Sequence, residues 1–444
     1  TEAGASATFS VKLNSAPTDD VTIGLSSNDL TEGAPDLTSL TFTPSNYATS
    51  QTVTVNPQDD LIDDDNVAYE IVTAPATSSD ATYHGLNGDD ITVINNDDDT
   101  AEITAVPLSG LTTNENGSTA SFQVALVTEP TNSVTVNITS TNTNEGTVSP
   151  TSLSFLTGNW NITQTVTITG QDDNATDGNT SYWIKLKGDS NDAKYHNLNG
   201  PNVSVTNLDN DVPGISVSAT SGLSTTEGGG AANFTVILNT QPSANVSLTI
   251  STSDATEGSP SPGTLNFTTT NWNTAQTVTI TGVDDNIDDG DVNYTLSGTT
   301  SSADTDYNSI SMPNVSLSNS DDDSKGISVN TSGTLITSET GNSATFTVVL
   351  DSEPTHDVSI GITSNDNTEG VVSVRTFTFT NLNWNTAQTV EITGVDDHTV
   401  DGDITYAAIT HAATSSDANY QNLNPTNVSV INTDDDVIGF KITP

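Results

Sequence analysis

The sequence contains no cysteine, and only seven lysine and arginine residues occur among its 444 residues. Without cysteine, neither disulfide bonds nor thiolate metal sites can form. The seven basic residues face 57 acidic ones, which gives a formal net charge of −50. This balance excludes nucleic acid as a default partner, because neutralising phosphates requires basic side chains. It also disfavours binding to anionic membrane surfaces.

Hydrophobic sequence is scarce as well. Apolar residues make up 32% of the chain, and no hydrophobic run approaches the ~18–20 residues that a membrane-spanning helix needs. Thr, Ser, Asn, Asp and Gly dominate instead. Such a composition is typical of many short strands joined by polar loops around small cores.

The acidic residues gather in runs such as Asp97-Asp98-Asp99, Asp321-Asp322-Asp323 and Asp434-Asp435-Asp436, whereas the strand-like segments are nearly uncharged. A halophilic protein spreads acids over every face, but a cation-binding protein concentrates them in particular loops. The clustering therefore favours cation binding, and a saline habitat is compatible with it.

Three landmarks recur along the chain with matching spacing. The first is a glutamate found at Glu2, Glu115, Glu227 and Glu339, in steps of 113, 112 and 112 residues. A second glutamate keeps the same steps, at Glu32, Glu145, Glu257 and Glu369. The third is an acidic turn in which a carboxylate pair is followed four residues later by another aspartate. Matching gaps over three landmarks indicate one structural repeat used four times.

The repeats predict the domain organisation of the chain. We expect one sandwich domain in each of residues 1–100, 101–212, 213–324 and 325–437, followed at 438–444 by the first strand of a further sandwich.

Within each repeat the apolar residues alternate with polar ones, as in Ala120-Ser121-Phe122-Gln123-Val124-Ala125-Leu126. This period of two predicts half-buried antiparallel strands. In the third repeat we expect strands at 215–219, 232–239, 246–251, 264–267, 275–282, 292–298 and 315–319. Seven short strands without any helical period predict an all-β fold, a tandem array of seven-stranded Greek-key (Ig-like) sandwiches.

Two kinds of aromatic residue recur between the strands. Trp160, Trp272 and Trp384 lie in Asn-Trp-Asn sequences and are expected to pack over the edge of the core, with a sugar-binding platform as the alternative. A tyrosine follows an aspartate by three residues in every repeat and is expected to form a tyrosine corner, with ligand contact as the alternative. These tyrosines are Tyr83, Tyr195, Tyr307 and Tyr420.

If the strands alternate in direction, the first, third and fifth connections and the exit of the seventh strand meet at one end of the sandwich. In the third repeat these segments carry Glu227, Asp254 and Glu257, the acidic turn 284–289, and the run 321–323. Carboxylates packed so closely repel one another unless a cation lies between them. Calcium accepts six to eight oxygen ligands, magnesium requires a strict octahedron, and zinc or copper would favour His or Cys. We therefore expect Ca²⁺ sites, with solvated acidic loops that oppose aggregation as the alternative.

The chain resembles the Calx-beta repeats of cation-exchanger regulatory loops and of large bacterial surface proteins. The resemblance rests on Thr-Glu-x-Gly before the second strand, Asp-Asp-x-x-x-Asp after the fifth and Asn-x-Asp-x-Asp closing the seventh. It implies a seven-stranded sandwich that binds calcium at this end. The ligands that it implies are Glu2, Asp59, Asp60, Asp64, Asp97, Asp98 and Asp99; Glu115, Asp172, Asp173, Asp177, Asp209 and Asp211; Glu227, Asp284, Asp285, Asp289, Asp321, Asp322 and Asp323; and Glu339, Asp396, Asp397, Asp401, Asp434, Asp435 and Asp436.

The sequence departs from the family pattern at two places. The family's Gly-x-Asp-Tyr in the third connection is absent, and Asn210 interrupts the terminal acidic run of the second repeat. The number of ions is therefore expected to differ between repeats. Glu32, Glu145, Glu257 and Glu369 are weaker ligand candidates, which would equally suit a hydrogen bond to a loop backbone.

The two ends of the sequence match different parts of a repeat. Residues 439–444 match the first strand at 214–219, and Thr1-Glu2 matches Thr226-Glu227, which follows such a strand. The first repeat is thus expected to lack its opening strand, and the chain to end with a spare one. A window cut from a longer array and head-to-tail assembly by strand donation both explain this arrangement.

No catalytic motif appears, and paired carboxylates repeated four times suit structure better than a single glycosidase site. We do not expect an enzyme. The sequence favours a structural extracellular or cell-surface protein, a calcium-stabilised fibre, sheath or stalk. An adhesin or a spacer region of a larger surface protein, with surface glycans as partners, is the alternative.

Overall fold

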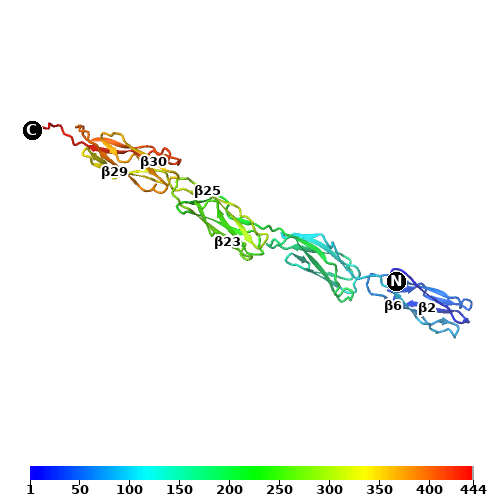
Figure 1. The fold of residues 1–444 in the computed structure, drawn as a ribbon. Coiled ribbons are helices and arrows are strands. Elements are labelled where there is room, and N and C mark those ends of the chain that lie inside the picture. Colours follow the sequence, from blue (N-terminus) through cyan, green and yellow to red (C-terminus); the bar gives the residue numbers. More distant parts are fainter. Residues whose placement is uncertain (443–444) are drawn as a thin grey trace. The chain divides into compact units, whose positions relative to one another are not determined.

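The computed structural model describes residues 1–442, in which there are 36 strands and no helix (Figure 1). Thr443 and Pro444, which belong to the strand expected at 438–444, lie outside the described residues. Since residues 1–442 contain no helix at all, they contain none that is suited to crossing a membrane.

The chain divides into two compact units, Thr1–Asp211 and Val212–Pro444. Each unit contains two separate hydrophobic cores, and each core lies between two β-sheets. We call these four bodies the first to fourth sandwiches. The boundaries between the two sandwiches within each unit remain predictions from the sequence.

The strands of the first unit are divided between the first two sandwiches (Figure 1). The first sandwich consists of β1 (Ala7–Val11), β2 (Val21–Ser27), β3 (Gly33–Pro35), β4 (Ser39–Phe42), β5 (Gln51–Pro57), β6 (Val67–Thr73), β7 (Thr77–Ser78) and β8 (Ile91–Asn95). The second consists of β9 (Ile103–Val106), β10 (Leu111–Asn114), β11 (Thr119–Leu126), β12 (Val134–Ser140), β13 (Gly146–Ser149), β14 (Ser152–Phe155), β15 (Gln164–Gly170), β16 (Thr180–Ser190) and β17 (Val203–Leu208).

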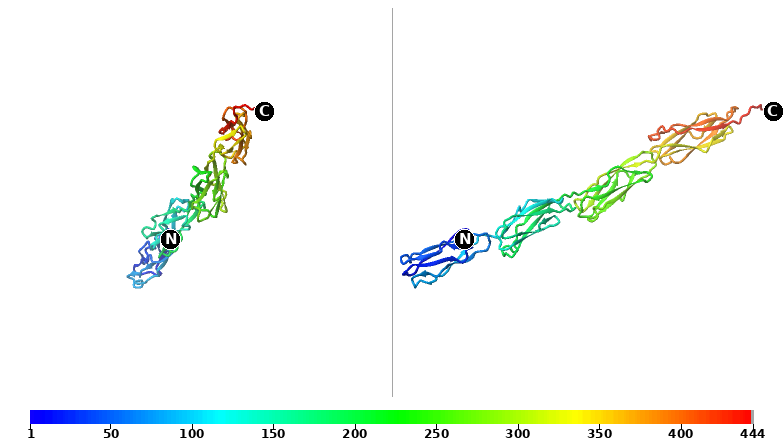
Figure 2. Two further views of the ribbon diagram at one scale, coloured as in Figure 1. Left: turned by 90° about the vertical axis from the view of Figure 1, so that its left-hand side faces the viewer. Right: turned by 180° about the vertical axis from the view of Figure 1, so that it is seen from behind.

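The second unit repeats this plan, and the ribbon views show the strands of each sandwich in two layers (Figure 2). The third sandwich consists of β18 (Ile215–Val217), β19 (Leu223–Thr226), β20 (Ala231–Leu238), β21 (Val246–Thr252), β22 (Gly258–Ser261), β23 (Thr264–Phe267), β24 (Gln276–Gly282), β25 (Val292–Ser302) and β26 (Val315–Ser320). The fourth consists of β27 (Ile327–Thr331), β28 (Leu335–Ser338), β29 (Ser343–Leu350), β30 (Val358–Ser364), β31 (Gly370–Val372), β32 (Thr376–Phe379), β33 (Gln388–Gly394), β34 (Ile404–Thr410), β35 (Thr414–Ser415) and β36 (Val428–Thr433).

The second sandwich shows the topology. One sheet has the order β13-β15-β11-β9, and the other has the order β10-β17-β16-β12-β14. All pairs are antiparallel except β10 with β17, which is parallel. On β11 the alternating Phe122, Val124 and Leu126 are buried, while the residues between them face outward. The period of two thus directs one face of each strand into the core, and the all-β sandwich prediction is confirmed.

The second and third sandwiches have nine strand segments each and the fourth has ten, where the sequence predicts seven. The first predicted strand, at 215–219, is found as β18, and a further segment, β19, follows it and joins the other sheet. β19 lies between the strands predicted at 215–219 and 232–239, where the sequence predicts no strand. The predicted set also omits β22, which is short, polar and contains Pro260. Its sequence carries no alternation, and only the pairing with β24 makes it a strand.

The first sandwich has no counterpart of β18 or β19. Its smaller sheet contains only β1, β5 and β3, and β8 ends the other sheet without a parallel neighbour. As a result Phe9 and Val11 are half-buried, whereas their counterparts Phe122 and Val124 are buried. The core is correspondingly smaller.

The recurring aromatic residues pack as the core-packing prediction requires. Trp160, Trp272 and Trp384 lie partly buried against their cores, so a sugar platform at these positions is not supported. The Tyr195 hydroxyl is buried and donates to the Thr128 carbonyl oxygen at 2.8 Å. Tyr83, Tyr307 and Tyr420 make the same bond to the matching carbonyl, at 2.7 to 2.9 Å. The tyrosine-corner prediction is confirmed.

Candidate metal centres

One end of each sandwich gathers the acidic residues, and we call this end the acidic pole. In the second sandwich Glu115 follows β10, Glu145 lies between β12 and β13, and Asp173 follows β15. The terminal run 209–211 follows β17. These segments are far apart in sequence, and they meet because β10, β12 and β17 run in the same direction: β10 pairs in parallel with β17, and β12 and β17 are both antiparallel to β16. The end of β15 lies beside the start of β13, which follows Glu145.

Carboxylate oxygens from these segments approach one another closely enough to bind a common cation. Groups whose ligand atoms all lie within 4.8 Å of one another occur in all four sandwiches. They include Glu2, Asp97 and Asp99; Glu115, Asp173 and Asp211; Glu145, Asp173 and Asp177; Glu227, Asp321 and Asp323; and Asp396, His398 and Asp436. Asp173 belongs to two of these groups, so two adjacent ions would share its carboxylate.

Two glutamates of each pole are buried. Glu115 is 2% exposed and Glu145 is 5% exposed. Asn207, on β17, donates its Nδ2–H to Glu145 Oε2 at 3.2 Å and to the Gln171 carbonyl oxygen at 3.1 Å. Its Oδ1 accepts the Thr113 hydroxyl at 2.9 Å. Asn207 therefore holds the Glu145 carboxylate in place within the acidic pole.

The other sandwiches repeat this support. Asn95, Asn319 and Asn432 donate to Glu32, Glu257 and Glu369 at 3.3 to 3.4 Å. The sequence analysis included the asparagine in a motif but missed its role. Its only signal was its place just before the terminal acidic run, at the end of a buried strand.

Several buried carboxylate oxygens in the poles have no hydrogen-bond partner among the described residues. They are Glu2 Oε2, Asp211 Oδ2 and Asp436 Oδ2. A buried carboxylate oxygen without a partner costs about 1–3 kcal/mol or more. Each of these residues belongs to one of the clustered groups. An oxygen-rich site with free acceptors fits a hard divalent cation such as Ca²⁺.

The raised pKa values of glutamates in the poles also favour a bound cation. Burial, together with the nearby charges of Asp60, Asp97 and Asp64, raises the pKa of Glu2 to about 7. Burial also raises the pKa of Glu115 to about 6 and of Glu227 to about 7. Because burial and mutual repulsion oppose ionisation, these carboxylates need a counter-charge to stay ionised together.

The remaining predicted ligands lie in the same poles. Burial is the main cause of the raised pKa values of Asp99, Asp211 and Asp323, and the neighbouring charges of Asp59, Asp172 and Asp284 contribute to them in turn. The pKa values of Asp64, Asp177 and Asp289 are raised, first by burial and then by neighbouring aspartates. Asp254, in contrast, uses its carboxylate to accept hydrogen bonds from Thr256.

The middle residue of the terminal acidic run contributes its backbone. The amides of Asn210, Asp322 and Asp435 donate to Oε2 of Glu115, Glu227 and Glu339, at 3.0 to 3.4 Å. The outer two residues hold the turn, since the Asp211 amide donates to Asp209 Oδ1 at 2.7 Å. Asn210 can therefore replace an aspartate here without altering this backbone contact.

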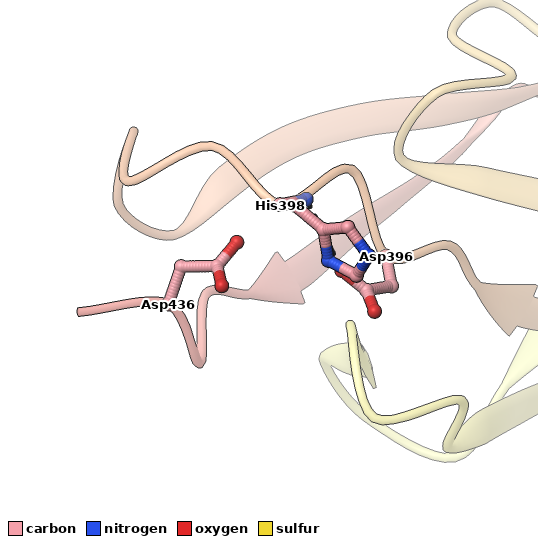
Figure 3. A group of neighbouring side chains, drawn as sticks. All are labelled: Asp396, His398 and Asp436. Atoms are coloured by element: carbon pink, nitrogen blue, oxygen red, sulfur yellow. Dashed lines mark hydrogen bonds and ion pairs between the residues drawn. The ribbon is translucent and has the colours of Figure 1, made fainter. Parts of the chain in front are cut away.

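The fourth pole differs in one ligand type. His398 stands where the other repeats have Leu61, Asn174 or Asn286, and its Nδ1 lies 2.5 Å from Asp396 Oδ1. Figure 3 shows Asp396 and His398 on the turn after β33, with Asp436 approaching from the exit of β36. A histidine occurs at this place of the acidic turn in the fourth repeat alone.

The acidic pole also contacts the next sandwich of the same unit. In the first unit Asp63 Oδ2 accepts the Ala101 amide at 2.8 Å, and its Oδ1 lies 2.5 Å from Lys194 Nζ of the second sandwich. Asp65 Oδ1 lies 2.7 Å from the same nitrogen. The lysine thus crosses to the rim of the first pole.

Neither a protein-family model nor a curated protein matches the chain. Weak structural similarity exists to CBD12 from CALX1.2, with 14% identity, a TM-score of 0.25, and 49% of this chain and 98% of that chain covered. The calcium-binding domain CBD12 of CALX1.1 has 16% identity and a TM-score of 0.24, covering 45% of this chain and 80% of that one. Domains 4 and 5 of the S-layer protein SbsC have 16% identity and a TM-score of 0.20, covering 42% and 75%.

Proposed function

We propose that this chain is a structural protein of the cell exterior, built of Calx-beta-like sandwiches whose acidic poles are held together by Ca²⁺. The observation that carries the proposal is the recurrence of buried glutamates and clustered aspartates, with unpaired oxygens, at the same end of the sandwiches. A solvated acidic loop would not bury its carboxylates.

In the second sandwich the ions would be held by Glu115, Glu145, Asp173, Asp177 and Asp211. When bound, calcium supplies positive charge that offsets the repulsion among these carboxylates. Glu145 is oriented by Asn207, so it enters the site already positioned. The all-oxygen donor set and its irregular arrangement favour calcium over magnesium.

A structural role agrees with the repetition of the poles. Four sandwiches present the same acidic groups, whereas an enzyme concentrates its catalytic groups at one site. A chain with few Lys and Arg residues also offers trypsin-like proteases little to cleave, which suits exposure outside a cell. A fibre, sheath or stalk is the form of protein that uses such an array.

Assembly is part of this proposal, because the first sandwich has room for a further strand. A cavity of about 420 Å³ is lined by residues including Val11, Leu13 and Tyr83. The open position corresponds to that of β9, which pairs with β11 in the second sandwich.

The segment 437–442 has the pattern that this position requires. Phe440 and Ile442 fall at the positions of Ile103 and Ala105, which are buried in the second sandwich, and both are exposed here. In a head-to-tail polymer the segment of a neighbouring copy would occupy the position. In a longer array, residues of the same chain would occupy it.

Thermal unfolding with and without a chelator tests the role of calcium. Saturation at a thousandfold excess over Kd stabilises a site by about 4 kcal/mol, so EDTA should lower the melting temperature by roughly 15 °C or more. Ca²⁺ should restore it, and Mg²⁺ should restore it poorly. Asp173→Asn should weaken binding, whereas Asp306→Asn, in the sixth connection, serves as a matched control. An unchanged melting temperature in EDTA would contradict the proposal.

A further inference from the structure

Trp183 differs from the other three tryptophans because its side chain is 49% exposed. It lies on β16, where Tyr182, Ile184 and Leu186 point into the core and the residues between them point outward. The outward row therefore reads Ser181, Trp183, Lys185, Lys187 and Asp189, and its central part is one aromatic ring followed by two lysines. The sequence analysis examined the three recurring tryptophans and missed this one, which belongs to no repeat motif.

The row is specific to the second sandwich. The buried tyrosine that precedes it recurs as Tyr69, Tyr294 and Tyr406, and the residues that follow these tyrosines are Glu70, Thr295 and Ala407. A structural requirement of the fold would appear in all four sandwiches. The aromatic ring and its two cations are therefore not needed to build the repeat.

The two lysines stand out in a chain of net charge −50. Only seven Lys and Arg residues occur in the whole sequence, and two of them lie side by side on this strand face. Among residues 1–442, no carboxylate lies within ion-pair distance of Lys185 or Lys187. Both ammonium groups are thus available to an external anion.

Apart from Asp189, whose carboxylate lies 3.7 Å from His196 Nδ1, the neighbours of Trp183 and the two lysines are neutral hydrogen-bonding groups. Thr139 and Asn137 of β12 lie opposite Lys185 and Lys187. Ser204 of β17 lies opposite Trp183 on the other side. These hydroxyl and amide groups can bind the hydroxyls of a ligand.

The backbone of Trp183 makes two hydrogen bonds to Thr141. Its amide donates to the Thr141 hydroxyl at 2.9 Å, and its carbonyl oxygen accepts the Thr141 amide at 2.9 Å. With β12 on one side and β17 on the other, the sheet fixes the backbone that carries the ring. A tryptophan side chain has only two rotatable torsions, so it loses little conformational entropy when it binds a ligand.

We propose that the outer face of β16 binds an acidic polysaccharide of the uronate type. A pyranose ring would stack on Trp183, whose flat apolar face matches that of a sugar. Carboxylates of the following residues of the polysaccharide would pair with Lys185 and Lys187. From Trp183 to Lys187 the strand extends about 13 Å, so the ligand must be an extended chain.

Charge complementarity favours this ligand over a neutral glycan, which would leave both lysines without a partner. Single-stranded nucleic acid can also stack on an aromatic ring and carries one anion per residue, as a polyuronate does, so the comparison with an oligothymidine decides between them. A polymer with both hydroxyls and carboxylates offers partners to the two lysines and to the neutral polar groups beside them.

Calorimetric titration of the full chain with tetragalacturonate in constant low calcium tests the proposal. We expect saturable binding at 50 mM NaCl that weakens at least tenfold at 500 mM, because the ion pairs are exposed. Maltotetraose, tetraglutamate and a short oligothymidine are the comparison ligands. Each should bind at least tenfold more weakly, since none offers both a sugar ring and carboxylates.

Variants assign the binding to β16. Trp183→Thr introduces the residue of the third sandwich and should weaken binding at least tenfold without lowering the melting temperature. The double variant Lys185→Ser, Lys187→Ser should have a similar effect and remove most of the salt dependence. Lys12→Ser, an exposed lysine of the first sandwich, is the matched control and should bind as the parent does.

Three outcomes would overturn the proposal. One is the absence of binding to tetragalacturonate, and another is equal binding by Trp183→Thr, which would indicate calcium bridging at the acidic poles. The third is tetraglutamate or oligothymidine binding as tightly, which would make the face a general anion site. Each outcome is separate from the chelation test, because β16 presents this row on its outer face rather than at the acidic pole.

Discussion

The joint within the first unit and the joint within the second unit use the same aspartate in different ways. Asp63 and Asp288 occupy matching places in the acidic turn, and both accept the amide of the linker residue, Ala101 at 2.8 Å and Lys325 at 2.6 Å. In the first unit the Asp63 carboxylate also pairs with Lys194. In the second unit Asn419 stands at the lysine position and donates instead to the Asp288 carbonyl oxygen.

The comparison separates what the repeat dictates from what is specific to one joint. The linker contact recurs because the acidic turns of the first and third repeats both have an aspartate at this place, where the second and fourth have Thr176 and Val400. The side-chain contact depends on one residue in the sixth connection, which is free to vary. The first joint is therefore electrostatic and the joint of the second unit mostly neutral, although both rest on an acidic pole.

The largest expected effect concerns pH in the metal-free protein. Glu2 and Glu227 have a pKa of about 7 in the folded state, above their ordinary value of 4.5. Below about pH 4.5 their contribution to stability is fully present, and it is lost as the pH rises through about 7. In EDTA the melting temperature should thus rise when the pH falls from 7.5 to 5. With calcium it should fall, because protons compete with the ion for the carboxylates.

The same acidification should leave the first joint intact. The hydrogen bond and charge of Lys194, with the hydrogen bond from the Ala101 amide, outweigh burial and hold the pKa of Asp63 below its ordinary value. Asp63 therefore stays ionised at pH 5. Spin labels on cysteines introduced into the first and second sandwiches would measure this, since the chain has no cysteine of its own. A broad distance distribution at pH 5 in calcium would contradict it.

The second prediction compares Asp63→Ala with Asp288→Ala. Asp63→Ala removes the acceptor for the linker amide and leaves Lys194 without this partner, which should cost the docked joint about 2 kcal/mol. Asp288→Ala removes only the acceptor for the linker amide, because Asn419 bonds to the backbone, and should cost about 1 kcal/mol. Label distances across each joint report the docked fraction. Equal losses would show that the lysine contributes nothing.

The third prediction is that Lys194→Ala weakens the first joint by about 1 kcal/mol at low salt. The loss should disappear near 1 M NaCl, where the screening length is about 3 Å. Lys194→Arg should retain the contact. A loss that is the same at both salt concentrations would assign the effect to packing of the side chain.

The smallest effect is expected for Asn419→Ala. One neutral hydrogen bond to a carbonyl oxygen contributes about 0.5–1 kcal/mol, and this contribution should not change with salt. Asn419→Lys would make the joint of the second unit resemble the first, and should give it salt dependence if the Asp288 carboxylate turns toward the ammonium group. If the joint of the second unit were salt-dependent without any substitution, the proposed difference between the two joints would be wrong.

The sequence determines the strands with strong alternation and the repeat, because both depend on local pattern. The strand predicted at 264–267 matches β23, and the tyrosine corners lie where an aspartate precedes a tyrosine by three residues. Segments without a pattern were not predictable. β19 and β22 are strands because a neighbouring strand pairs with them, and their own residues do not indicate it.

For the acidic poles, too, some features follow from the sequence and others only from the tertiary structure. The sequence alone determines that acidic residues recur with fixed spacing, because spacing is a property of the chain. Only the tertiary structure decides that Glu145 is buried beneath Asn207, that the middle residue of the terminal run uses its amide, and that Trp183 is exposed while Trp160 is not. Burial and hydrogen bonding depend on residues that are distant in sequence, and folding brings them together.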